Sequence, residues 1–319
     1  MILVEEDGTY DLAALKTALL QSKSQMLAAR ERRYDAVLEY NKPYHGDMIG
    51  VATSRSVPQA RQFMFNRAVQ VYCRLLAARR PKVNVRTWDS DGRAYAGLLE
   101  KATNQQLKVM QMERVFKRAV LDAMFAAGAT KTGIDAQGSV YVKEVDFDDL
   151  VLDHAANNIR EMRYIGNFYR MPYSEVENIV PREYAKVSQV YVGEPWDVKP
   201  LSTPLPPSTI EPEVELLDVF LVRERMICTF ATSGRTSFNE IKEMCIPYVG
   251  PDEGPYDVLY LGAQPKSVLP MPPGWVMKEL SRAIDEITSK LFRQARRQKN
   301  IIVGPDKKDL ERILKAMDS

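Results

Sequence analysis

The sequence predicts an α+β fold that is mainly helical, and two observations favour this prediction. Thirteen of the 19 prolines lie between Pro195 and Pro273, and proline is poorly tolerated inside helices. Elsewhere apolar residues recur at helical spacing over long stretches, whereas alternating segments rich in β-branched residues are short. We therefore expect residues 1–190 and 274–319 to be mainly helical, with a module of loops and strands between them.

Two helices should open the chain. The first follows Asp11, a suitable N-cap, carries Leu15, Leu19 and Met26 at helical spacing, and ends near Asn41. The second should run from about 58 to 78. Its apolar face comprises Met64, Ala68, Val71, Tyr72 and Leu75. The segment PKVNVRTW (81–88) that follows alternates like a strand.

A long helix should cover residues 91–127 and end where Gly128 supplies a left-handed stop. After it, TKTGID (130–135) and SVYVKEV (139–145) predict two strands joined in a small hairpin. Residues 194–212 hold six prolines and should form an extended connector. Residues 213–262 predict a compact β-rich subdomain, which is acidic, with nine Asp/Glu against four Lys/Arg.

The last long helix should run from about Trp275 to Asn300, because Pro272 and Pro273 precede it and proline suits a first helical turn. At about 100° per residue, two sets of residues fall on opposite halves of this helix. An apolar stripe that should pack comprises Leu280, Ile284, Ile287, Leu291 and Ala295. A positive half comprises Lys278, Arg282, Lys290, Arg293, Arg296 and Arg297.

Composition argues against several classes of protein. The three cysteines lack metal-type spacing, and an odd number cannot close a disulfide framework, so we expect a reducing compartment. No apolar run approaches the roughly 20 residues of a membrane span, and the first residues lack a signal-peptide pattern, so we expect no membrane association. His45 and His154 are far apart, which disfavours a histidine triad or a two-histidine zinc site. No cofactor or metal is expected.

Two charge patterns remain as candidate sites. Asp146, Asp148, Asp149 and Asp153 form a carboxylate cluster, which could hold magnesium for phosphoryl chemistry or simply cap and solvate a loop. Basic residues are concentrated in two segments, although the net charge is only +2. Residues 55–86 hold eight Lys/Arg and residues 290–299 hold five, and neither segment contains Asp or Glu. Such side chains suit DNA phosphates without reading sequence, and equally suit acids on a neighbouring helix or subunit.

Several stretches follow one another in an informative order. A helix containing RERRYDAVLEYN (30–41) precedes FNRAVQVYCRLLAARRPKVNV (65–85), which ends in a Pro-x-Val-x-Val pattern. Residues 94–107 and 116–135 predict helices and a hairpin, and residues 254–303 place a double proline before an Arg/Gln/Lys-rich helix. In this order of elements the chain resembles the portal proteins, or head–tail connectors, of tailed double-stranded DNA bacteriophages.

The resemblance implies the phage portal fold, with a helical wing, a β-rich clip and a long stem helix. The wing would cover 1–212, including the connector at 194–212, the clip 213–262 and the stem-helix region 263–303. Residues 304–319 would begin the return to the wing. In the family the chain continues into a channel loop and usually a crown, so we expect a longer gene product; the alternative is a portal without a crown.

The resemblance also implies a structural role without catalysis. Portal subunits form a ring of about twelve copies at one capsid vertex of the virion, assembled in the host cytoplasm, with a channel for double-stranded DNA during packaging and ejection. Expected partners are other copies of the chain, the terminase large subunit, a head–tail adaptor, and capsid and scaffolding proteins. The candidates for contact with channel DNA or a neighbouring subunit are Arg282, Lys290, Arg293, Arg296, Arg297 and Lys299. Rival interpretations are a metal-dependent nuclease that uses the carboxylate cluster and a DNA-binding adaptor that forms no ring.

Overall fold

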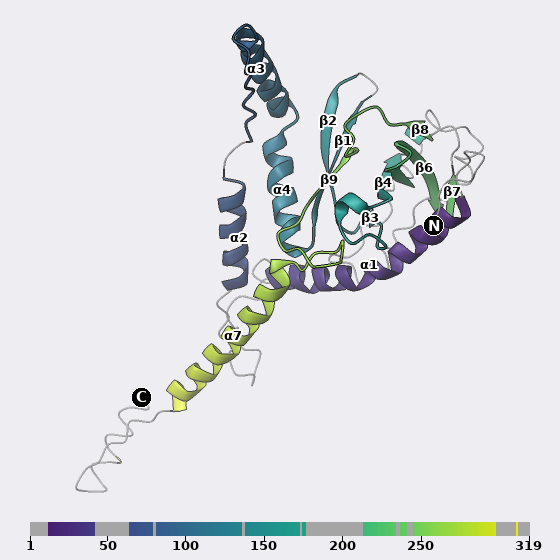
Figure 1. The fold of residues 1–319 in the computed structure, drawn as a ribbon. Coiled ribbons are helices and arrows are strands. Elements are labelled where there is room, and N and C mark those ends of the chain that lie inside the picture. Colours follow the sequence, from purple (N-terminus) through teal and green to yellow (C-terminus); the bar gives the residue numbers. More distant parts are fainter. Residues whose placement is uncertain are drawn as a thin grey trace.

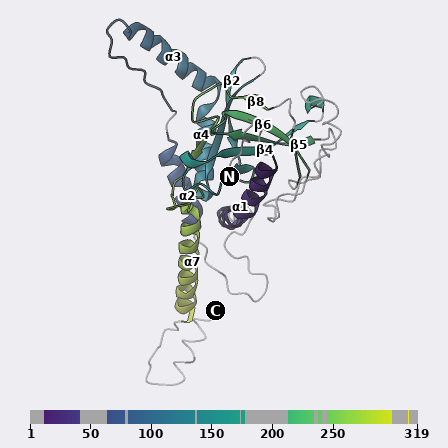
Figure 2. The same cartoon turned by 45° about the vertical axis from the view of Figure 1, so that its right-hand side comes forward.

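A computed structural model describes residues 12–41, 64–78, 81–135, 138–172, 174–176, 213–233, 237–240, 245–297 and 311. It combines α-helices with antiparallel β-sheet, which agrees with the predicted α+β class. Figures 1 and 2 show a body of sheets and helices from which two helices, α3 (Arg93–Val109) and α7 (Pro273–Arg297), project at opposite ends. The predicted connector at 194–212 and the return segment at 304–319, apart from residue 311, lie outside the described residues.

The strands form two antiparallel sheets. The smaller sheet has the order β2-β1-β9 and joins β1 (Gly128–Ile134) to β2 (Val140–Val145) and β9 (Tyr256–Leu259). The predicted hairpin at 130–145 is confirmed as β1 and β2, and Gly138 in its turn has a φ of 80°, which glycine adopts without strain. The strand β9, which comes from far along the chain, pairs with the other edge of β1.

The larger sheet has the order β3-β4-β5-β6-β7, with β8 beside β6. Its strands are β3 (Leu150–Leu152), β4 (Tyr164–Pro172), β5 (Glu213–Leu221), β6 (Met226–Ser233), β7 (Ser237–Glu240) and β8 (Ile246–Pro247), and a short 3-10 turn, η2 (Ile159–Glu161), precedes β4. The segment 213–262 is thus β-rich, as predicted. Its strands nevertheless pair outside the segment, β5 with β4 and β9 with β1, so they share both sheets with residues 128–172.

The first helix, α1 (Leu12–Asn41), covers the larger sheet and ends where predicted. Leu15 and Leu19 pack on sheet residues that include Leu217 and Phe230, and Met26 reaches a second cluster that contains Phe147 and other residues from both sheets. A third cluster joins the end of α1 to α2 (Met64–Leu76) and α4 (Met112–Phe125). The core therefore extends along α1 from the sheets to a helical junction.

The predicted long helix at 91–127 is wrong, because it is two helices. Gln111 adopts a left-handed conformation, with a φ of 52°, and separates α3 from α4. Gly128 does not provide a left-handed stop, since α4 ends at Phe125 and Gly128 opens β1. A side chain at Gly128 would overlap the carbonyl of Ala119, so the glycine permits close packing of the strand on α4.

The predicted strand at 81–88 is also wrong. This segment is extended, but it pairs with side chains of α3 rather than with another strand. The N–H of Val83 donates to Asn104 Oδ1 at 3.0 Å, and Asn104 Nδ2 donates to the carbonyl of Val83 at 2.8 Å. The N–H of Val85 donates to Glu100 Oε2 at 3.2 Å. A strand-like pattern therefore reports an extended backbone and does not identify the partner of that backbone.

Candidate assembly surface

The helix α7 is fixed to the body through its first turns. A Cβ atom added to Gly274 would lie 2.6 Å from the carbonyl oxygen of Met124, so α7 begins in direct contact with the backbone of α4. Lys278 is buried, with its Nζ 3.5 Å from the centroid of the Trp275 ring and 3.6 Å from Asp35 Oδ2. One turn later, Arg282 Nε donates to Glu39 Oε2 at 2.9 Å. Polar contacts thus hold α7 against α1.

The face of α7 that packs on the body is the opposite of the predicted one. Lys278 is 1% exposed, and Ser281 and Ser289 are also buried. Leu280 is 63% exposed, whereas Ile287 and Leu291 are each 58% exposed. The expectation that this apolar stripe packs within the chain is therefore wrong for these three residues and for Ala295, which is also exposed, whereas Ile284 is partly buried. Helical spacing separates two faces, but it does not say which face the same chain covers.

We define the α7 stripe as the exposed apolar residues on one side of α7: Val276, Leu280, Ala283, Ile287 and Leu291. Their spacing of three or four residues places them on one line along the helix. Figure 1 shows α7 leaving the body, so its later turns, which include Ile287 and Leu291, lie away from the sheets. Among the described residues, no element covers this stripe.

A second exposed apolar surface lies on α2. We define the α2 face as Met64, Val71, Tyr72 and Leu75, which were predicted to share one side of this helix. Leu75 is 71% exposed, and the other three are each about half exposed. The opposite side of α2 packs into the helical junction through Phe65 and Val69. The sequence identified the side, but its apolar character suggested a core position.

The predicted basic residues at 282–299 differ in whether the structure describes their side chains and acidic partners. Arg282 pairs with Glu39 and Glu279, and Lys290 Nζ lies 2.7 Å from Glu286 Oε1 within α7. Both basic side chains are therefore compensated within one chain. Arg293, Arg296 and Arg297 belong to the end of α7, but their side chains, and Lys299 altogether, lie outside the described residues.

The carboxylates predicted as a possible magnesium site are bound by arginines. Arg33 Nη1 donates to Asp148 Oδ2 at 2.6 Å, and Arg33 Nη2 lies 3.0 Å from Asp146 Oδ1 and 3.7 Å from Asp122 Oδ1. Burial raises the pKa of Asp122 to about 6, and the neighbouring carboxylates act in the same direction, while Arg33 opposes them. These partly exposed acids therefore form an ion-pair cluster around the buried Arg33 side chain.

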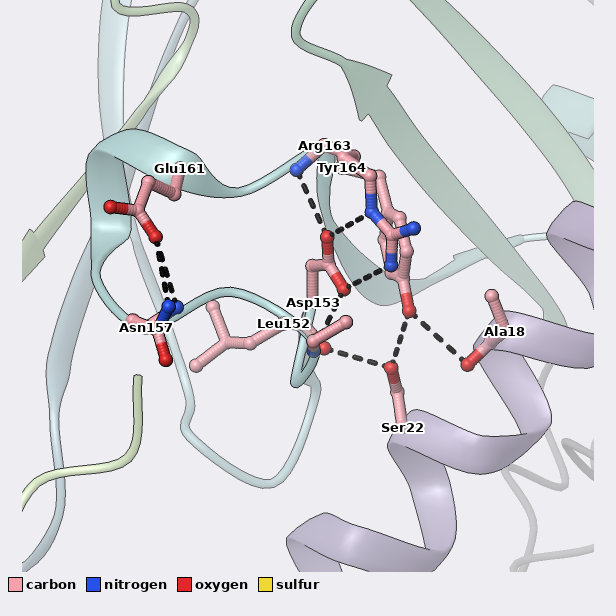
Figure 3. Close-up of polar contacts among 9 residues, drawn as sticks. Ala18, Ser22, Leu152, Asp153, Asn157, Glu161, Arg163 and Tyr164 are labelled. Carbon is pink, nitrogen blue, oxygen red and sulfur yellow. Dashed lines mark hydrogen bonds and ion pairs between the residues drawn. The ribbon is translucent and has the colours of Figure 1, made fainter. Parts of the chain in front are cut away.

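Asp153 belongs to a separate network that joins α1 to the larger sheet (Figure 3). Arg163 Nε and Nη2 donate to the two oxygens of Asp153 at 2.7 and 2.9 Å. Burial alone would raise the pKa of Asp153, but the bonds from Arg163 and from the Ala155 N–H lower it. Beside it, Ser22 donates to the carbonyl of Leu152, and Tyr164 Oη donates to the carbonyl of Ala18.

The four predicted acids therefore do not converge on one open site. Asp146 and Asp148 share Arg33, Asp153 faces Arg163, and Asp149 lies in the turn before β3. Within the described parts of the chain, no group of three or more His, Cys, Asp or Glu side chains is arranged to hold a metal ion.

Two buried arginines, Arg30 and Arg33, were missed by the sequence reasoning. They continue the buried stripe of α1 defined by Leu15, Leu19 and Met26, at the same helical spacing. That periodicity was the signal that could have identified them, because a charged residue on a buried helical face requires a partner.

No protein-family model matches this chain, and no curated protein is similar enough to count as a relative. In the described residues, no helix combines the length and apolar character needed to cross a membrane.

Proposed function

We propose that this chain is a structural subunit of a phage portal, which assembles into a ring around a DNA channel. The observation that carries the proposal is the presence of two separate exposed apolar surfaces, the α7 stripe and the α2 face, on one chain. A ring requires such a pair, because each subunit must present one surface to the neighbour ahead and a different surface to the neighbour behind.

The size of these surfaces favours assembly. Half-exposed leucine, isoleucine, valine and tyrosine side chains each present on the order of 100 Å², so each surface offers roughly 400 Å² of apolar area. Each surface is therefore comparable to the largest apolar patch on a typical monomer, about 300–600 Å², and patches of that size often mark interaction sites. A contact between the two surfaces could therefore form the apolar centre of an interface, whose rim would come from other residues.

The proposed channel role requires weak contact with DNA. Lys and Arg side chains that touch phosphates provide sequence-independent attraction, which permits DNA to slide. The basic end of α7, with Arg293, Arg296 and Arg297, is the proposed source of that contact. Docking of a terminase large subunit, a head–tail adaptor, and capsid and scaffolding proteins, and location at the portal vertex of a virion, belong to the same proposal and follow from the sequence resemblance.

The first test is the mass of the purified chain and of an α7 stripe variant, measured by native mass spectrometry. A subunit of 36.3 kDa in a ring of about twelve would give ~436 kDa. Ile287→Glu with Leu291→Glu should abolish rings, because it places two charges in an apolar contact. Ala102→Glu with Gln105→Glu adds the same charge to exposed positions of α3 and should leave rings intact. A wild-type chain that stays monomeric at all concentrations contradicts the proposal.

Mixing two variants distinguishes a head-to-tail contact from a symmetric one. Leu75→Glu removes the α2 face, and the Ile287→Glu, Leu291→Glu chain lacks the α7 stripe. If the stripe of one copy meets the α2 face of the next, the mixture retains one intact pair of surfaces and should form 1:1 dimers of about 73 kDa that do not grow. If α7 stripes pair with each other, the mixture should form no such dimer, and Leu75→Glu alone should assemble normally.

A further inference from the structure

A basic cluster surrounds the junction of α3 and α4. Its five exposed cations are Lys108, Arg114, Lys117, Arg118 and Lys143. They line two hollows, of about 470 Å³ and about 360 Å³, which share Gln111, Arg114 and Arg118. These shared residues form a ridge with a hollow on each side. Figures 1 and 2 show that this junction lies at the base of the projecting α3, far from the end of α7.

The charge of this cluster is only partly compensated. Lys117 Nζ lies 2.7 Å from Glu113 Oε1, and Arg118 pairs with Glu144. Lys143 stacks on the Tyr141 ring, with its Nζ 5.0 Å from the centroid. Across the described part of the chain, Lys108 and Arg114 have no acidic partner. Five cations against two acids leave a net charge of about +3 on a small surface, which attracts anions strongly.

The left-handed conformation of Gln111 creates this arrangement. A continuous helix would place residues 107–118 on one axis, whereas the break turns α4 away from α3, and Gln111, Arg114 and Arg118 come to line both hollows. Non-glycine residues in this conformation cost free energy and concentrate at functional sites. The break thus converts a helical row of charges into a cluster with two hollows.

We infer that this cluster binds the phosphate backbone of nucleic acid, at a site separate from the proposed channel. Cations on both sides of a ridge suit a ligand whose anionic groups repeat, because each hollow can accept a different phosphate. Long lysine and arginine side chains contact such a backbone without reading its sequence. This inference goes beyond the proposed function and does not depend on ring assembly.

The test measures the salt dependence of binding to a short fluorescein-labelled DNA duplex by anisotropy. Each phosphate contact contributes about 0.9 to the slope of log K against log salt. Lys108→Gln with Arg114→Gln should therefore lower that slope by about 1.8. The matched control, Arg93→Gln with Lys101→Gln, removes one arginine and one lysine from exposed positions of α3 outside both hollows, and should leave the slope unchanged.

Three further arms separate this inference from its alternatives. The difference in slope between the test and control variants should persist when both also carry Ile287→Glu and Leu291→Glu. These substitutions block the proposed assembly in both chains, so assembly cannot cause the difference. Polyglutamate should compete poorly with the duplex; equal competition would identify a site for acidic protein and overturn the inference. Displacement of the duplex by inorganic phosphate at low millimolar concentration, or equal slopes for test and control variants, would overturn it as well. Circular dichroism verifies that each variant is folded.

Discussion

Buried charged side chains, such as that of Arg33, determine how α1 packs against the rest of the chain. Arg33, which is 7% exposed, faces three carboxylates from two segments: Asp122 of α4, and Asp146 and Asp148 of the turn after β2. Burial raises the pKa of both Asp122 and Asp148, and the carboxylates reinforce one another. Arg33, together with Arg30, whose Nε lies 4.0 Å from Asp148 Oδ1, compensates this acidic group incompletely, and the cluster should respond to pH.

Asp122→Asn tests this response. Because the pKa of Asp122 rises from 3.8 to about 6 on folding, its contribution to stability is present below pH 4 and is lost as pH rises through about 6. Relative to wild type, the Asn variant should gain up to about 3 kcal/mol between pH 4 and pH 7, and no more above that range. Chemical denaturation at several pH values measures the difference.

The control is Glu253→Gln, which removes a carboxylate from an exposed turn. Its effect on stability should be small at every pH. A pH-independent effect of Asp122→Asn would mean that this carboxyl titrates normally in the folded chain.

At the scale of elements, the break at Gln111 is the clearest departure from the periodicity of the sequence. Residues 91–127 are compatible with one helix, and local preference alone gives no reason for a break. A left-handed residue other than glycine costs about 1 kcal/mol or more, so the break must be maintained by the packing of α4 on β1 and β2 and by the contacts of α3 with residues 81–85.

Gln111→Gly should therefore stabilise the chain by roughly 0.5–1 kcal/mol, because glycine adopts this conformation without strain. A denaturant titration against wild type provides the measurement. Destabilisation of similar size would indicate that the Gln111 side chain contributes more than its backbone conformation costs.

The elements themselves were largely predictable, but their partners were not. Helical spacing identified α1 and α7, and a turn between alternating segments identified β1 and β2. The pairing of β5 with β4 and of β9 with β1 joins segments distant in sequence, which local patterns do not encode. The predicted orientation of α7 was wrong for a related reason. Leu280 and Ile287 have the spacing of core residues, yet the chain buries Lys278 instead.

The candidate site was predictable to a similar extent. The sequence placed Arg282 and Lys290 on one side of a helix, but their acidic partners Glu39 and Glu286 are apparent only from contacts. The carboxylate cluster at 146–153 was apparent in the sequence. Arg33, which forms ion pairs with Asp146 and Asp148 of this cluster, lies more than one hundred residues earlier. Charge compensation of this kind depends on tertiary structure.

For the whole molecule, the attachment of α7 sets the direction in which the α7 stripe points. Gly274→Ala would force a Cβ to within 2.6 Å of the Met124 carbonyl oxygen, and the backbone of α4 cannot move freely. We expect a loss of about 1–3 kcal/mol in stability and, if the chain forms the proposed ring, a lower yield of rings, because neighbouring subunits would meet a displaced helix. Thermal unfolding and native mass spectrometry measure the two effects.

Gly97→Ala is the matched control, because the added Cβ at this position of α3 meets nothing within 4 Å. It should raise stability by up to about 1 kcal/mol and leave assembly unchanged. A Gly274→Ala chain that forms rings as well as the Gly97→Ala chain would show that the direction of α7 is not set at this contact.

The pairing of β1 with β9 also has a consequence for synthesis on the ribosome. The smaller sheet cannot be completed until residue 259 has emerged, so one edge of the strand at 128–134 stays unpaired while the larger sheet forms. The helix α7 follows β9 in the sequence and therefore emerges from the ribosome after it. Among the described elements, α7 with its exposed apolar stripe therefore follows the strands of both sheets, which reduces the time during which unfinished chains could associate through it.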